Sequence, residues 1–130
     1  MRKQTINVPG IPKSPGYSQA VRIGNTVYVA GTIAFDPKTL KVEETTIEGQ
    51  TDRAIQNCAT ILRAAGSSLD DVVQVIVLLK NPADVVGMSA VYTKHFPKDE
   101  PARAITKLGV DRPDVLVSFM MTAVIPDGSS

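Results

Sequence analysis

The sequence is poor in the residues from which most metal sites and covalent active sites are built. It holds one cysteine, one histidine and no tryptophan. A zinc site needs about four converging Cys, His or acidic side chains, and an internal disulfide needs a pair of cysteines, so neither is expected. No glycine-rich phosphate loop, nucleophile elbow or Cys-x-x-Cys pair is present. Only chemistry without a metal or a cofactor remains open to this chain.

The chain also lacks a strong charge of either sign. Lys and Arg together number 14 and Asp and Glu 13, so no positive field draws the protein onto nucleic acid or an anionic membrane. The longest apolar runs, near 72–79 and 115–125, are well short of the roughly 20 residues that cross a bilayer. No secretory signal is found at the N-terminus, and the lone Cys58 fits a reducing compartment. We expect a cytoplasmic or, as the alternative, a mitochondrial protein without nucleic-acid or membrane partners.

The pattern of apolar residues predicts one domain over residues 1–130, with an irregular lead-in at 1–15. Apolar residues make up 43% and charged residues 21% of the chain, as in ordinary globular domains. Helices are expected at 45–65 and 81–96. Strands are expected at 17–23, 26–29, 72–79, 102–108 and 115–125. The order β-β-α-β-α-β-β predicts an α+β fold in which a mixed sheet carries two helices on one face.

Each predicted helix has a start signal. Thr45 and Glu48 have the spacing of a capping box, and Asn81-Pro82 places a cap residue before a proline at the first helical position. In the first helix one face repeats at intervals of three and four through Ile47, Thr51, Ile55, Cys58, Leu62 and Ala65. Cys58 is therefore expected to be inert core.

Two of the predicted strands bear on how the sheet is buried and on assembly. The run 72–79 is continuously apolar and is expected to be a central strand buried on both faces. Along 115–125 both alternating sets of side chains are mainly apolar, yet two helices cover only one face of a sheet. A soluble monomer rarely exposes a large apolar face, so we expect a homo-oligomer that packs sheet against sheet.

Three segments resemble the signature sequences of one family. They are the run from Gly16 to Gly31, the helix-to-strand junction from Ala64 to Val73, and the loop from Phe96 to Arg103 with its Pro-Ala-Arg motif. In this order they resemble the Rid (reactive intermediate deaminase, YjgF-like) family over residues 16–124. The resemblance implies a chorismate-mutase-like fold of the bacillus type and a homotrimer with a small-molecule cleft at each subunit interface.

The resemblance also implies a reaction. Well-studied members hydrolyse 2-imino acids, or their enamine tautomers, to 2-keto acids and ammonia without a metal or cofactor. The motif arginine, Arg103, would bind the substrate carboxylate through two parallel N–H···O bonds, a geometry that Lys cannot reproduce. Tyr17 and Gly31 would line the same cleft. Without the motif, Arg103 is a surface ion-pair residue and Tyr17 a core or rim aromatic.

Four polar positions of the family pattern have changed together. Ala30 replaces a hydroxyl residue, Ser89 replaces an Asn, Ile105 replaces a Cys, and Ser118 replaces the Glu thought to hold or activate the attacking water. A carboxylate accepts a proton from water, whereas a serine hydroxyl does not. Ser118 is left to orient a water, or simply to fill space in the strand.

These observations leave three classes of function. The first is a cofactor-free deaminase of small 2-imino carboxylates, with Arg103 as anchor and Ser118 at the reacting centre. The changed positions favour the second, which is a redirected enzyme of a specialised pathway or a non-catalytic, metabolite-binding or chaperone-like trimer. The third, a ribonuclease or translation inhibitor, conflicts with the balanced charge and with a single His95, which at a helix end is expected to interact with the helix dipole or line a rim.

Overall fold

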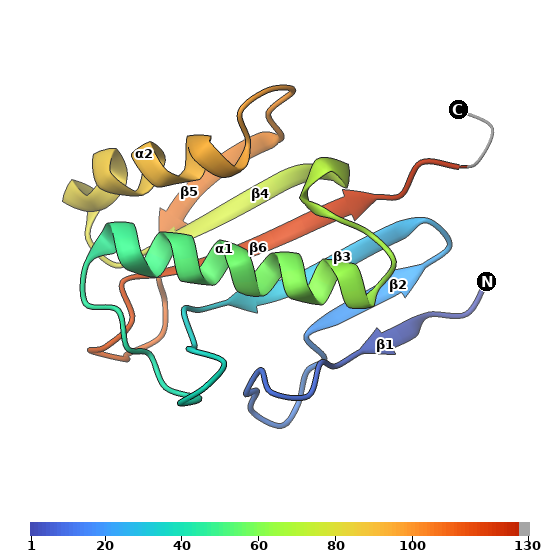
Figure 1. The fold of residues 1–130 in the computed structure, drawn as a ribbon, viewed down its shortest axis with the longest axis horizontal. Helices are drawn as coiled ribbons and strands as arrows, with labels where there is room; N and C mark the ends of the chain where they lie inside the picture. Colours follow the sequence, from blue (N-terminus) through green and yellow to red (C-terminus); the bar gives the residue numbers. More distant parts are fainter. Residues whose placement is uncertain (128–130) are drawn as a thin grey trace.

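The computed structural model describes residues 1–127 and contains a six-stranded sheet with two helices lying against one of its faces (Figure 1). The strand order is β1-β2-β3-β6-β4-β5, in which β4 and β5 are parallel and the other neighbours antiparallel. The strands are β1 Gln4–Ile6, β2 Ala20–Ile23, β3 Thr26–Thr32, β4 Val72–Leu79, β5 Ala102–Lys107 and β6 Val117–Val124. The helices are α1 Ile47–Ala64 and α2 Val85–His95. The predicted α+β class, with a mixed sheet and two helices on one face, is confirmed.

The core lies between the helices and the sheet. The side chains of β6 that face the helices are at most 1% exposed: Val117, Phe119, Met121 and Ala123. The stripe predicted for the first helix packs against them, with Ile55, Cys58 and Leu62 fully buried. Burial raises the pKa of the Cys58 thiol to about 12, so this sulfur stays un-ionised near neutral pH.

The other face of the sheet is uncovered in the single chain. Tyr28, Met120 and Val124 lie there and are 53%, 40% and 45% exposed. Strand β4, expected to be buried on both faces, is buried only on its helix side, and Val73 is 48% exposed. This uncovered apolar surface is the one that the composition of the last strand led us to expect. Within residues 1–127 neither helix is long and apolar enough to cross a membrane.

Neither helix begins at its predicted cap. Thr46, rather than Thr45, caps α1, and its hydroxyl oxygen accepts a hydrogen bond of 3.0 Å from the Gly49 backbone N–H. Asn81 makes no side-chain cap and precedes a single 3₁₀ turn at Pro82–Asp84, so α2 begins only at Val85. Adjacent threonines offer the same hydroxyl group, and only the local backbone decides which of them caps.

The lead-in predicted to be irregular is more ordered than expected. Its residues Gln4–Ile6 form the edge strand β1, which pairs with β2. A strand of three residues carries almost no local signal, because its hydrogen bonds depend on a partner far along the chain. The strand predicted at 17–23 begins only at Ala20, and the one predicted at 115–125 begins only at Val117. Residues 128–130, the end of the predicted domain, lie outside the described part.

Candidate active site

A cleft of about 760 Å³ lies at the end of the sheet where β3 and β4 finish and β6 begins. Four of the predicted site residues line it: Tyr17, Ala30, Gly31 and Ser118. The remaining three, Ser89, Arg103 and Ile105, do not. The residues that the family resemblance assigned to one site are therefore divided between two places on this chain.

Small side chains form the floor of the cleft. A register shift between Val29 and Thr32 in the β3–β6 pairing leaves Gly31 beside Ser118. A Cβ atom at Gly31 would lie 3.1 Å from the Ser118 Oγ, which is tighter than ordinary van der Waals contact, so any larger residue at 31 would push on this hydroxyl. Ser118 is 6% exposed. Its hydroxyl thus lies in a narrow, mostly enclosed position from which it can hold a water or a small polar group.

One wall of the cleft is the lead-in, and Gln19 holds it in place. The Gln19 side-chain oxygen accepts a hydrogen bond of 2.6 Å from the Val8 N–H, and its amide nitrogen donates one of 2.7 Å to the Ile11 carbonyl. The backbone N–H of Gln19 donates to the Asn7 side chain at 3.0 Å. Gln19 is 4% exposed. A buried glutamine that satisfies backbone groups in this way fixes a loop that has little secondary structure of its own.

Another wall is the segment between β5 and β6, and Gln50 of α1 holds it through the hydrogen bonds that follow. The Gln50 amide nitrogen donates to the carbonyls of Glu44 at 2.9 Å and Asp114 at 2.8 Å. Its side-chain oxygen accepts from the Leu116 N–H at 2.8 Å. This last bond also explains the late start of β6, because the Leu116 N–H is used outside the sheet. Sequence analysis missed both glutamines; for Gln50 the available signal was a polar residue three positions after Ile47 on the apolar helix face.

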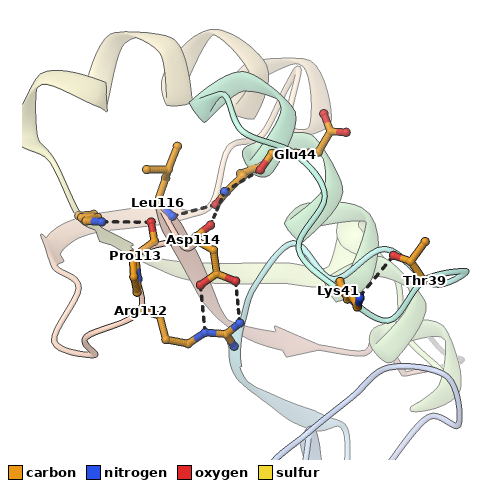
Figure 2. Close-up of polar contacts among 9 residues, drawn as sticks. Thr39, Lys41, Glu44, Arg112, Pro113, Asp114 and Leu116 are labelled. Atoms are coloured by element: carbon orange, nitrogen blue, oxygen red, sulfur yellow. Dashed lines mark hydrogen bonds and ion pairs between the residues drawn. The ribbon is translucent and has the colours of Figure 1, made fainter.

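Two cationic side chains stand at the cleft, and neither is Arg103. Arg112 forms two hydrogen bonds, of 2.8 and 3.3 Å, with the carboxylate of Asp114 (Figure 2). These bonds lower the pKa of Asp114 and neutralise the guanidinium. The Lys13 ammonium lies 5.2 Å from the centre of the Tyr17 ring and donates to the Ser14 carbonyl at 3.1 Å. Lys13 therefore sits above a ring that is itself 46% exposed.

Arg103 lies elsewhere, on the edge strand β5 beside helix α2. Its guanidinium lies 4.9 Å from the centre of the Tyr92 ring and donates to the Ser89 hydroxyl at 3.3 Å. Tyr92 is 4% exposed and packs against Phe96 with ring centres 4.8 Å apart; burial raises its pKa. Within residues 1–127, no carboxylate forms an ion pair with Arg103. Its charge is thus positioned by an aromatic face and a hydroxyl and is left open to an anion.

The register of the sheet puts Arg103 and Ser118 on opposite faces. Paired residues in neighbouring strands share a face, and successive residues of a strand alternate. Arg103 pairs with Val75, which faces the helices, whereas Ser118 pairs with Leu78, three positions further along the same strand. Because side chains alternate along a strand, positions separated by an odd number of residues point to opposite faces of the sheet. A single chain therefore cannot present both side chains to one small molecule. Ile105 lies on the same face as Arg103 and is 39% exposed.

The remaining titratable groups form no second centre. Within residues 1–127 no group of three or more His, Cys, Asp or Glu side chains is placed to hold a metal ion. The His95 Nε2 lies 2.8 Å from an Asp52 carboxylate oxygen and so ties the end of α2 to α1. This contact gives His95 a structural partner away from the cleft, in addition to the position at the helix end that we expected.

Comparison with known proteins agrees with the motifs. The sequence profile described as Endoribonuclease L-PSP matches residues 11–125. A RutC family protein of Pyrococcus abyssi is 42% identical over 120 residues, 92% of this chain and 94% of its own length. A protein of Dermatophagoides farinae named 2-iminobutanoate/2-iminopropanoate deaminase is 33% identical over 103 residues, 78% of this chain and 80% of its own length.

The fold agrees as well. The crystal structure of RidA from the Antarctic bacterium Psychrobacter sp. PAMC 21119 superposes with a TM-score of 0.85 at 34% identity, covering 94% of this chain and 99% of that one. Sequence profile, relatives and fold all lead to the same family, which includes named imine deaminases. The chain belongs to the Rid (YjgF-like, Endoribonuclease L-PSP) family.

Proposed function

We propose that this protein is a cofactor-free, Rid-type deaminase of small 2-imino carboxylates whose cleft is shared between two subunits of a homotrimer. One subunit supplies Arg103, and its neighbour supplies the cleft lined by Tyr17, Ala30, Gly31 and Ser118. The observation that carries the proposal is the uncompensated guanidinium of Arg103, which has no carboxylate partner among residues 1–127. Its position on the other face from Ser118 supports its assignment to a second subunit.

The chemistry follows from these groups. The Arg103 guanidinium binds the substrate carboxylate through two parallel hydrogen bonds and fixes the adjacent imine carbon. Water adds its oxygen to that carbon, both of its protons pass in turn to the nitrogen, the C–N bond breaks, and ammonia and a 2-oxo acid leave. The Ser118 hydroxyl orients the water but does not remove its proton. Loss of a general base commonly lowers a rate by about 10²- to 10⁴-fold, so turnover is expected to be slow.

The direct test is release of ammonia from 2-iminopropanoate or 2-iminobutanoate generated in situ. We expect a rate above the buffer blank that falls to the blank in the Arg103→Gln variant. A wild-type rate equal to the blank, with the protein folded, would remove the deaminase activity from the proposal.

The shared cleft has its own test, which is complementation between two defective variants. Arg103→Gln removes the anchor, and Ala30→Phe blocks the cleft. If both halves come from one subunit, mixed trimers stay defective. If they come from neighbours, random mixing restores about one quarter of the sites, because that fraction of interfaces combines the two intact halves. Calorimetric titration with 2-oxobutanoate counts the sites, and light scattering at micromolar concentration checks that the assembly is a trimer.

A redirected enzyme or a binding protein is the second candidate. The observation that favours it is the apolar or small character of Ala30, Ile105 and Ser118, which leaves no carboxylate at the reacting centre. Selective thermal stabilisation by a 2-oxo acid, without ammonia release from the matching imine, is the result expected for binding alone.

A further inference from the structure

We propose that this cleft selects 2-imino carboxylates with a long apolar side chain over the three- and four-carbon compounds. The inference rests on the proposed function, because Arg103 of a neighbouring subunit is to hold the carboxylate. It concerns the other end of the substrate, for which the cleft described above is the receptor.

The size of the cleft is the first observation. Its volume of about 760 Å³ lies within the range of about 300–1,000 Å³ that proteins use for ligands of drug size. A three-carbon imino acid has a handful of non-hydrogen atoms and fills a small part of this space. The small floor residues Ala30, Gly31 and Ser118 leave depth below the entrance, so an extended chain has room to enter.

The chemistry of the walls is the second observation. Six apolar side chains line the cleft, and they come from the segment after β3, from β4, from the loop after β5 and from β6: Ile33, Phe35, Leu78, Leu108, Val110 and Met120. Val110 is 59% exposed in the single chain. Apolar surface gathered in a concave site is stabilised when a ligand removes it from water.

Three polar side chains of the cleft are engaged already, which is the third observation. The Gln19 side chain is occupied by the lead-in backbone, and the Thr32 hydroxyl donates to the Ala30 carbonyl at 2.8 Å. The Arg112 guanidinium is paired with Asp114. A ligand with several hydroxyl or carboxylate groups would find these three groups already occupied. An alkyl chain needs no hydrogen-bond partner.

The test is a calorimetric titration of the assembled protein with unbranched 2-oxo acids, the products of the proposed reaction. The series runs from 2-oxopropanoate and 2-oxobutanoate through 2-oxohexanoate to 2-oxooctanoate. A buried methylene contributes about 0.8 kcal/mol, so affinity should rise about fourfold per added carbon and on the order of 100-fold between 2-oxobutanoate and 2-oxooctanoate. Equal affinity along the series would overturn the inference and leave the proposed function standing. Absence of binding by every member would overturn both.

A matched pair of variants locates the effect. Val110→Asn adds a polar amide to the wall at an exposed position, and the fold should tolerate it. It should lower the affinity for 2-oxooctanoate about tenfold and leave that for 2-oxopropanoate unchanged. Val86→Asn makes the same substitution on α2, where the side chain is 80% exposed and outside the cleft, and should change neither. Equal effects of the two variants would overturn the assignment of the cleft.

The Arg103→Gln variant distinguishes binding through the carboxylate from apolar adhesion of the alkyl chain alone. If the carboxylate is held by Arg103, affinity for every member of the series should fall by a similar factor of about 10²-fold. Undiminished binding of 2-oxooctanoate to this variant would show that the alkyl chain adheres without the anchor, and the inference would be wrong.

Discussion

The two halves of the proposed site are held in place by different means. Around Ser118, the cleft walls are tied to the sheet and to α1 by buried glutamines, each of which makes at least two short hydrogen bonds to distant backbone groups. Around Arg103, the edge strand β5 is exposed throughout, and the guanidinium rests on one ring face and one hydroxyl. In the proposed function, the cleft therefore lies within one chain, whereas Arg103 comes from another chain.

The largest expected effect comes from removing the hydrogen bonds that hold a wall of the cleft. Gln50→Ala removes three hydrogen bonds from a side chain that is 1% exposed. At about 1 kcal/mol each, the free energy of unfolding should fall by about 3 kcal/mol, measured by denaturant titration. Gln56→Ala, on the exposed side of the same helix, is the control and should cost less than about 0.5 kcal/mol. Equal losses would mean that Gln50 does not hold the wall.

The next effect comes from changing the proposed carboxylate anchor, Arg103, while the cleft around Ser118 stays intact. Arg103→Lys keeps the positive charge but loses the planar pair of donors, and we expect about 10²-fold weaker binding of 2-oxobutanoate with an unchanged melting temperature. Arg63→Lys, near the end of α1 and exposed, serves as the control. Retained affinity in Arg103→Lys would argue for a point-charge interaction or for a different anchor such as Lys13.

A third variant tests whether the cleft lacks only a general base for imine hydrolysis. Ser118→Glu should raise imine hydrolysis about tenfold, a gain that corresponds to only about 1.4 kcal/mol of transition-state stabilisation. Ala30→Ser, added to it, restores a second polar group to the floor. Ammonia release per trimer is the measurement. If both variants fold and bind 2-oxobutanoate without any gain, the cleft has been rebuilt for other chemistry.

The smallest effect concerns the surface on which Arg103 rests. Tyr92→Leu removes the ring beneath the guanidinium and should weaken carboxylate binding about threefold. Tyr92→Phe keeps the ring and removes a buried hydroxyl that has no hydrogen-bond partner among the described residues, so it should restore the affinity and leave the melting temperature equal or higher. Failure of Phe to restore binding would assign the effect to general loss of packing.

Much of the fold could be predicted because its signals are local. The apolar stripe of α1 repeats along the chain, and the run that forms β4 is unmistakably β-branched. Strand β1 and the two glutamine ties could not be predicted, because their partners lie at distances of 6 to 66 residues along the chain. The motif arginine was found by resemblance, but its separation from Ser118 depends on strand register, which a single sequence does not reveal.

The side chains that face a ligand in the cleft are different from Gln19 and Gln50, whose hydrogen bonds hold the walls of the cleft. Both side chains form hydrogen bonds with backbone groups. Every residue type offers the same backbone N–H and C=O groups, except that proline has no N–H. Side chains between the tied points, such as Val110 and Lys13, can therefore vary without loosening either wall. A protein built in this way can acquire a new ligand through a few loop substitutions, and a library confined to residues 12–14 and 108–110 would be the economical way to redirect it.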